Sequence, residues 1–341
     1  MNLKRNIWIG TIILLPVVSF LYSAQHRDRS VSPDIAIKPD IVYGHKYGLA
    51  LTMDMYQPKN HNGAAVLFMN SGGFVSGQLK QYEIVDGEYR FVGPDELLIL
   101  PYKFHYPPLE QWSFQELLAN GFTIFDIRHG SSPKFTLDEI VGDVRRGIRF
   151  AKYHAEEFNI DPHRIGLAGA SAGGYLAIFL AVSADEDIRE AGSQILESGD
   201  EIDRIDTKVQ AVATWYPAGY DFLVIKESSP EAYKNLPALH IDDEILDSLS
   251  IKRYISPNDP PVYIIYGNED FPFLIIEACQ AIHRDCQKHG VESKLIEIPG
   301  TGHEFRGQNN EYHAQHGKRA MSDIVAWFKM HLITRFEENE N

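Results

Sequence analysis

The segment from Arg164 to Ala177, R-I-G-L-A-G-A-S-A-G-G-Y-L-A, constrains the fold of this chain more than any other. A short apolar run leads into Gly-Ala-Ser-Ala-Gly at positions 169–173, and an apolar helical pattern follows at once. A strand, a sharp turn with a serine at its tip and then a helix form the context of a nucleophile elbow. We therefore expect Ser171 at the carboxyl end of a strand, with the backbone N–H of Ala172 facing any oxyanion formed there.

Apolar runs and helical patterns alternate along the rest of the chain. Such alternation is typical of the α/β class, with a mostly parallel sheet and right-handed crossovers. An alternating pattern around a glycine turn predicts a hairpin at one edge of that sheet. The predicted hairpin covers 41–56, the other strands cover 64–69, 123–127, 165–168, 209–215, 261–266 and 292–298, and the helices cover 112–119, 137–158, 175–182, 273–290 and 318–332.

A glycine-containing loop, N-S-G-G-F-V-S-G at 70–77, directly follows the apolar run at 64–69. Backbone N–H groups in such a loop can face an anion, and this is the position from which an elbow serine receives its other oxyanion donors. The sequence therefore predicts Gly72 and Gly73 as donors beside Ala172.

Partners for the serine are expected in the chain order serine, acid, histidine. The run at 261–266 ends in G-N-E-D, which places Asp270 at a strand end, and His303 lies in a glycine-flanked loop after the last predicted strand. Glu269 competes with Asp270 for the role of the acid, and Asp270 alone could also be a helix N-cap. The ordered combination favours Ser171, Asp270 and His303 as a catalytic triad.

Residues 40–335 are expected to form the catalytic domain, followed by a polar tail at 336–341. Two stretches within it lack a clean period: 78–108, a long lid-like insertion, and 216–260, a possible small cap with short helical pieces around 229–235 and 241–249. The aromatic residues in the insertion suit stacking on sugar rings, although they could equally pack the insertion onto the domain. The predicted substrate contacts are Tyr102, Phe104, Tyr106 and Tyr216.

The N-terminus has the pattern of a targeting segment. Lys4 and Arg5 precede an apolar run of 16 residues at 7–22, which is short for a membrane-spanning helix and typical of a signal peptide. Ala24 suits cleavage, but Tyr22 is bulky, so both a signal peptide and an uncleaved anchor remain open for 1–24. Residues 25–39 read as a linker. We expect export to the periplasm or the medium, with membrane contact only through this segment.

Charge and cysteine content exclude several classes of protein. A net charge of −15 without a long basic run argues against a nucleic-acid partner. Cys279 and Cys286 lie seven residues apart on a predicted helix, about 10 Å, which is too far for a disulfide. Neither they nor the set His303, His313 and His316 have metal-ligand spacing. We therefore expect no metal and no cofactor.

The chain resembles the carboxylesterase branch of the α/β-hydrolases. Within that branch it is most similar to the acetyl-xylan-esterase and feruloyl-esterase-like enzymes, which are relatives of hormone-sensitive lipase. The resemblance implies an α/β-hydrolase fold and implies the same triad and oxyanion donors. The family usually has His-Gly-Gly-Gly in the oxyanion loop, whereas this chain has Asn70 in place of the histidine. The matching pieces are Asp40–Tyr56, Ser71–Phe74, Asn159–Gly174, Tyr266–Asp270 and Gly300–Phe305.

These patterns predict a serine esterase that works through an acyl-enzyme. The expected substrates are short-chain esters, acetyl esters above all, of carbohydrates or other small molecules. Two other functions stay open: a peptidase of the same fold, and a catalytically inactive hydrolase fold used for binding. The oligomeric state and the natural substrate do not follow from the sequence.

Overall fold

The computed structural model describes residues 34–77, 82–85, 88–91, 109–184, 200–306 and 310–335. The chain divides into two compact units, Met1–Ser32 and Pro33–Asn341, and every described residue belongs to the second. The predicted signal peptide or anchor and the tail at 336–341 therefore lie outside the described residues. Within the described part, no helix has the length and apolar character needed to cross a bilayer.

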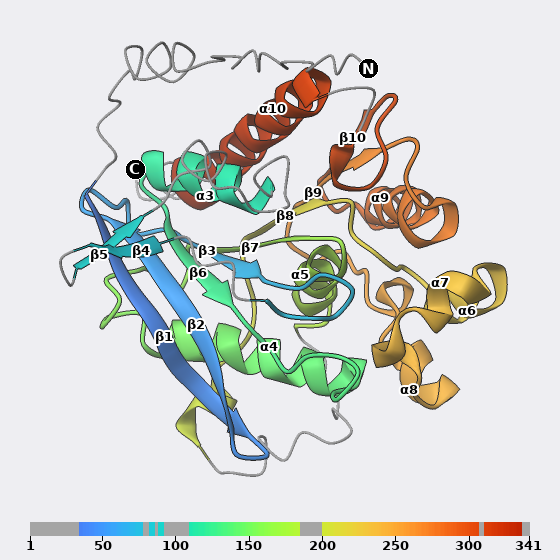
Figure 1. Ribbon diagram of the computed structural model, residues 1–341, viewed down its shortest axis with the longest axis horizontal. Helices are drawn as coiled ribbons and strands as arrows, with labels where there is room; N and C mark the ends of the chain where they lie inside the picture. Colours follow the sequence, from blue (N-terminus) through green and yellow to red (C-terminus); the bar gives the residue numbers. More distant parts are fainter. Residues whose placement is uncertain are drawn as a thin grey trace, which may run out of the picture. The chain divides into compact units, whose positions relative to one another are not determined.

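The main sheet consists of β1 (Ile35–Lys46), β2 (Leu49–Pro58), β3 (Ala65–Met69), β6 (Thr123–Ile127), β7 (Ile165–Ala170), β8 (Ala211–Trp215), β9 (Val262–Gly267) and β10 (Ser293–Ile298). Its eight strands follow the order β1-β2-β6-β3-β7-β8-β9-β10 (Figure 1). β2 is antiparallel to both β1 and β6, whereas the strands from β6 to β10 are mutually parallel. The edge hairpin and the mostly parallel sheet are thus confirmed.

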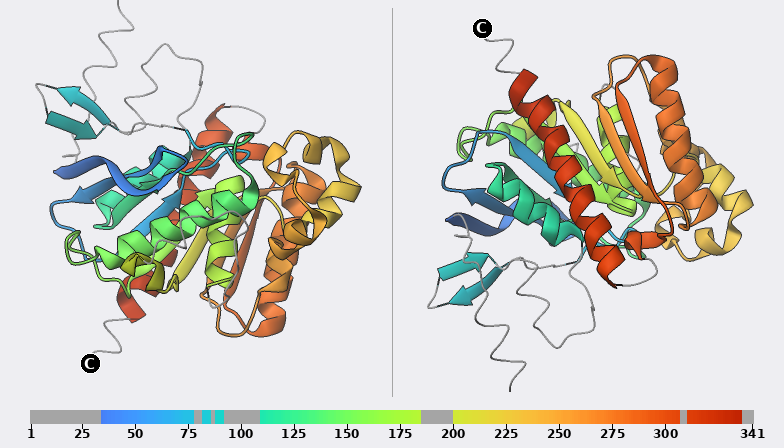
Figure 2. Two further views of the ribbon diagram at one scale, coloured as in Figure 1. Left: turned by 90° about the horizontal axis from the view of Figure 1, so that it is seen from below. Right: turned by 90° about the horizontal axis from the view of Figure 1, so that it is seen from above.

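Helices cover both faces of this sheet. They are α3 (Leu109–Ala119), α4 (Leu137–Tyr153), α5 (Ala172–Val182), α9 (Glu277–His289) and α10 (Asn310–Lys329). α3 and α10 lie side by side on one face, and α4 and α5 lie on the other (Figures 1 and 2). α9 packs against β9 and β10. Every residue of β3, β7, β8 and β9 is buried, as the continuous apolar runs predicted.

Local sequence explains where these elements start and stop. α4 begins with a capping box, in which the backbone N–H of Thr136 donates to Glu139 Oε2 at 3.0 Å. It ends at Tyr153, before the predicted end at Phe158, because residues 154–159 form turns. Gly166 in β7 leaves room for α10, since a Cβ there would lie 2.5 Å from a ring carbon of Phe328.

A buried ion pair fastens the edge hairpin to α4. Lys46 Nζ lies 3.0 Å from Asp143 Oδ1 and also donates to the backbone oxygen of Glu139 at 3.0 Å. The other carboxylate oxygen of Asp143 accepts the backbone N–H of Gly130 at 2.9 Å. Burial raises the pKa of Asp143, and the nearby Lys46 ammonium opposes that shift. The hairpin, α4 and the loop after β6 therefore share one buried charge centre.

Short helices follow β8 within the stretch 216–260, which we call the cap: α6 (Phe222–Ser228), α7 (Pro230–Lys234) and α8 (Asp243–Ser248). The sequence predicted helical pieces at 229–235 and 241–249 but missed α6. Its N-cap is Asp221, which accepts the backbone N–H of Leu223 at 3.1 Å. An aspartate directly before an apolar run was the signal that could have revealed this helix.

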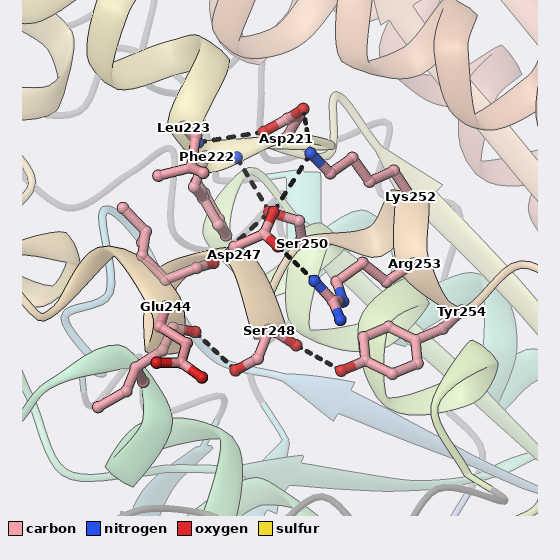
Figure 3. Close-up of polar contacts among 12 residues, drawn as sticks. Asp221, Phe222, Leu223, Glu244, Asp247, Ser248, Ser250, Lys252, Arg253 and Tyr254 are labelled. Atoms are coloured by element: carbon pink, nitrogen blue, oxygen red, sulfur yellow. Dashed lines mark hydrogen bonds and ion pairs between the residues drawn. The ribbon is translucent and has the colours of Figure 1, made fainter.

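Charged contacts hold the cap together. Lys252 Nζ bonds Asp221 at 2.6 Å and Asp247 at 3.2 Å, so one ammonium joins the start of α6 to α8 (Figure 3). The hydroxyl of Tyr175 in α5 donates to the backbone oxygen of Leu249 at 2.6 Å. The cap is thereby tied to the helix that follows the elbow serine.

Only part of the predicted insertion at 78–108 is described. It contains an antiparallel pair of short strands, β4 (Tyr82–Val85) and β5 (Glu88–Phe91). The predicted substrate contacts Tyr102, Phe104 and Tyr106 lie outside the described residues.

Candidate active site

The turn between β7 and α5 holds Ser171 in an unusual backbone conformation. Its φ and ψ are 54° and −120°, a region that side chains rarely adopt and that is found at functional turns. A Cβ on Gly169 would lie 2.4 Å from the oxygen of Gly173, and one on Gly173 would lie 2.2 Å from the oxygen of Met69. Only glycine fits at both positions, which explains the spacing of the motif.

Three side chains from distant parts of the chain meet at this turn. His303, in the short helical turn after β10, has Nε2 3.2 Å from Ser171 Oγ. Its Nδ1 lies 3.0 Å from each carboxylate oxygen of Asp270, which follows β9. These residues follow β7, β9 and β10, which are parallel strands of one sheet with only β8 between β7 and β9, so their carboxyl ends bring the side chains together.

Of the two candidate acids, Asp270 is the one that contacts the histidine. Its carboxylate is fully buried and also accepts the backbone N–H of Phe271 at 2.7 Å. Glu269 is exposed, and its backbone N–H is bonded to Thr301 at 2.8 Å. The chain thus presents one carboxylate to His303 and the other to solvent.

The predicted oxyanion donors differ in their surroundings. The N–H of Gly72 donates to the oxygen of Val75 at 3.0 Å, and Val75 donates back at 2.9 Å, so this amide is engaged within the loop itself. In the described part of the chain, the N–H groups of Gly73 and Ala172 have no acceptor. Ala172 is the first residue of α5, where a backbone N–H lacks an intrahelical partner. The N–H of Gly72, which we expected to face an oxyanion, is therefore bonded within the loop, unlike those of Gly73 and Ala172.

Asn70 fastens the oxyanion loop where the family usually has a histidine. Its amide nitrogen donates to Asp126 Oδ2 at 3.1 Å, and its amide oxygen accepts the N–H of Gly77 at 3.4 Å. The loop is also bonded to the elbow, because the N–H of Gly173 donates to the oxygen of Ser71 at 3.0 Å. A neutral amide thus connects both ends of the loop to the sheet.

Tyr216 occupies a different place from the one predicted for a substrate contact. It follows β8, and only 2% of its surface is exposed. Its ring centroid lies 4.7 Å from that of His303 and 5.1 Å from that of Phe305. The more exposed ring beside the histidine is Phe271, at 5.5 Å. Tyr216 therefore lies behind the histidine.

Cap residues that the sequence did not single out reach the oxyanion loop. A side-chain carbon of Leu236, between α7 and the end of the cap, lies 3.8 Å from the point that a Cβ on Gly73 would occupy. Phe74 packs edge-on against Tyr175 at 5.9 Å, and Tyr175 packs against Phe222 of α6 at 4.9 Å. No local pattern marks Leu236, because its role depends on how the cap folds back.

A buried thiol close to the acid does not compete as a nucleophile. Burial raises the pKa of Cys279 well above its usual value, and the Asp270 carboxylate raises it further. Cys279 and Cys286 are both free, which confirms the prediction that they form no disulfide. In the described residues, no group of three or more His, Cys, Asp or Glu side chains is placed to hold a metal ion.

Known structures of esterases have the same fold. Esterase B from Lactobacillus rhamnosis superimposes with a TM-score of 0.62 and 16% identity, covering 95% of this chain and 94% of that one. The acetyl ester-xyloside bifunctional hydrolase from Caldicellulosiruptor lactoaceticus superimposes with a TM-score of 0.61 and 18% identity, covering 88% of this chain and 98% of that one. These likenesses confirm the α/β-hydrolase fold.

Sequence relatives include Esterase LipC of Mycobacterium tuberculosis, 27% identical over 55% of this chain and 46% of its own length. Acetylxylan esterase of Xylanibacter ruminicola is 25% identical over 55% of this chain and 35% of its own length. The chain spans about half the length of the first relatives that it matches, or less. The family model described as BD-FAE matches residues 106–283, a range that includes Ser171 and Asp270 and ends before His303. Because this match covers more than half of the 341 residues, the chain belongs to the BD-FAE family.

Proposed function

We propose that this protein is a serine carboxylesterase. The observation that carries the proposal is the unbroken contact from Asp270 through His303 to Ser171, at 3.0 Å and 3.2 Å. A serine hydroxyl is a weak nucleophile at neutral pH and needs a base within hydrogen-bond reach. A carboxylate at Nδ1 holds the imidazole in the tautomer whose Nε2 accepts the serine proton.

The reaction then runs in two halves. Ser171 Oγ bonds to the ester carbonyl carbon while its proton passes to His303 Nε2. The tetrahedral intermediate collapses, its bond to the alcohol oxygen breaks, and His303 returns the proton to the leaving alcohol. Water attacks the acyl-enzyme by the same route and releases the acid. Asp270 stays ionised throughout and stabilises the imidazolium that forms in each half.

The oxyanion is proposed to rest on the N–H groups of Gly73 and Ala172. Both lack an acceptor in the described part of the chain, and the start of α5 adds the positive end of a helix dipole. Gly72 contributes by shaping the turn, since its own N–H is bonded to Val75.

The proposed substrates are short-chain esters, acetyl esters above all, of carbohydrates or other polyols. Relatives named acetylxylan esterase and acetyl esterase support this choice of acyl group. Leu236 lies 3.8 Å from the point that a Cβ on Gly73 would occupy, and this proximity of the cap to the oxyanion loop supports a confined site. Export, inferred from the N-terminal pattern, would bring the protein to such esters outside the cytoplasm.

Replacement of the nucleophile tests the reaction. Ser171→Ala should lower kcat for p-nitrophenyl acetate by a factor on the order of 10⁶, with an unchanged melting temperature. A fluorophosphonate probe should label the wild-type protein at Ser171 and leave the variant unlabelled. Activity of the variant within tenfold of wild type would exclude Ser171 as nucleophile, and an inactive wild-type protein would support a binding function instead.

A substrate panel tests the acyl preference. We expect kcat/KM to fall along the series of acetyl, butyryl, octanoyl and palmitoyl p-nitrophenyl esters, and we expect acetate release from acetylated xylan. Aminoacyl nitroanilides belong in the same panel, because hydrolysis of these amides would indicate a peptidase. A preference for octanoyl or longer chains would contradict the proposed substrate class.

A further inference from the structure

One short turn touches both the nucleophile and the segment that carries the base. The backbone N–H of Ser171 donates to the oxygen of Trp215 at 3.0 Å, and the N–H of Ala218 donates to the oxygen of Ser171 at 3.0 Å. The turn at 215–218 is therefore hydrogen-bonded to both the N–H and the carbonyl oxygen of Ser171. Tyr216 belongs to this turn, and its own N–H donates to the backbone oxygen of Ile265 in β9 at 2.7 Å.

The ring of Tyr216 extends from this turn to the imidazole. Its centroid lies 4.7 Å from that of His303, with the two planes inclined by 58°. Behind it, Phe305 packs edge-on at 5.1 Å and has no exposed surface. Phe271 contacts the imidazole from another side at 5.5 Å, but 53% of its surface is exposed. Of the two aromatic rings that contact His303 in the described part of the chain, Tyr216 is thus the buried one.

Backbone strain concentrates at the same place. In the described part of the chain, eight residues other than glycine have a positive φ, and four of them surround the histidine. Residues in this region need surrounding contacts to hold them there, and they are found where a site depends on fixed geometry. The four are Ser171 at 54°, Tyr216 at 38°, Glu304 at 57° and Phe305 at 55°.

We propose that Tyr216 is a positioning residue, which sets the direction of Nε2 of His303 toward Ser171. This inference rests on the proposed function. The Asp270 carboxylate fixes one point of the imidazole, at Nδ1, and the ring can still swing about that point. A second, buried contact on the ring removes this freedom. Because the turn that carries Tyr216 is bonded to the backbone of Ser171, the same element sets both ends of the 3.2 Å contact.

The first test compares two replacements of Tyr216 in the purified protein. Tyr216→Leu should lower kcat for p-nitrophenyl acetate about 100-fold, the loss expected when a reacting group is displaced by about 1 Å. KM should stay within about threefold, because the ring lies behind the base. Tyr216→Phe keeps the aromatic ring and should retain kcat within about threefold. Rates are divided by the folded fraction measured by circular dichroism, so that unfolded molecules do not count.

Tyr263→Leu serves as the matched control. Tyr263 is fully buried in β9 and packs against Trp327 at 5.6 Å, so its loss damages the core without touching the site. It should lower the melting temperature and leave kcat per folded molecule unchanged. If Tyr216→Leu does not fold, Tyr216→Met fills a similar volume without a ring and should show the same loss of kcat.

Three outcomes would overturn the inference: an unchanged kcat in the ringless variant, a loss that appears in KM alone, or an equal loss in Tyr216→Phe. The Ser171→Ala protein, measured beside them, separates a failure of the proposed function from a failure of the positioning role of Tyr216. If it remains active, the proposed function fails. If it is inactive while the ringless Tyr216 variant behaves as wild type, only the positioning role fails.

Discussion

Glu269 and Asp270 are neighbours in sequence, yet their carboxylates face opposite surroundings. Asp270 is buried against His303 Nδ1, whereas Glu269 is exposed. Asp270→Asn should therefore lower kcat about 10⁴-fold, because the amide holds the imidazole in the wrong tautomer. Glu269→Gln should stay within about twofold of wild type. Both values come from initial rates on p-nitrophenyl acetate at saturating substrate.

The neighbouring acid is also the internal control for this prediction. The two variants remove the same charge one residue apart, so any general effect of net charge appears in both. A larger loss in Glu269→Gln than in Asp270→Asn would show that the acid has been assigned one residue too late.

Single residues of the site differed in how far the sequence could predict their position. Ser171, Asp270 and His303 could be placed near one another because each follows a strand, and parallel strands end at one edge of a sheet. The engagement of Gly72 with Val75 could not be predicted, since it depends on the closure of one turn. The burial of Tyr216 behind His303 depends on contacts between distant segments, and no local pattern reports these.

At the scale of elements, the buried pair of Lys46 and Asp143 links the edge hairpin to α4. Asp143→Ala should lower the free energy of unfolding by about 3 kcal/mol, because the buried Lys46 side chain would lose its carboxylate partner at 3.0 Å and keep only Glu139 Oε1 at 3.8 Å. Urea unfolding followed by tryptophan fluorescence measures this loss. The triad lies elsewhere, so kcat of the folded fraction should not change.

A double replacement separates the charge from the packing. In Lys46→Met with Asp143→Asn, both charges are gone, and the amide oxygen of the new residue can still accept the N–H of Gly130. We expect this protein to be more stable than Asp143→Ala. If the double variant is equally destabilised, the packing of these side chains rather than their charge pairing holds the hairpin.

Elements were predictable where their pattern was local. The strands buried on both faces appear as unbroken apolar runs, and Thr136 with Glu139 marks the start of α4. The cap was less predictable: α6, seven residues long, was missed although Asp221 marks its start. The approach of the cap to Gly73 is made by Leu236 and depends on tertiary packing, which no local pattern predicts.

For the molecule as a whole, two buried histidines make stability depend on pH. Burial lowers the pKa of His129 from 6.5 to about 4, and the Lys46 charge lowers it further while a bond to Gly130 opposes the shift. Burial, with the Arg335 charge, likewise lowers the pKa of His331 to about 4. Between pH 6.5 and 4 the unfolded chain therefore binds more protons than the folded chain. The free energy of unfolding has its full value above pH 6.5 and falls as the pH drops toward 4.

Each histidine should contribute a slope of about 1.4 kcal/mol per pH unit across that window. Free energies of unfolding in urea at pH 7.5, 6 and 5 give the slope for the wild type and for His129→Gln, which should be flatter by that amount. His163→Gln is the control, because His163 is exposed in the folded protein. An unchanged slope in His129→Gln would show that this histidine is already charged in the folded state.

The order of Ser171 and His303 in the sequence has a consequence for the activity of the chain during its synthesis. Ser171 leaves the ribosome 132 residues before His303, which follows the last strand of the sheet. Under the proposed function, a nascent chain that ends before His303 carries the elbow without its proton acceptor and cleaves no ester. Under the proposed function, hydrolysis therefore requires β10 as well as the elbow, and its return after denaturation reports when both are in place.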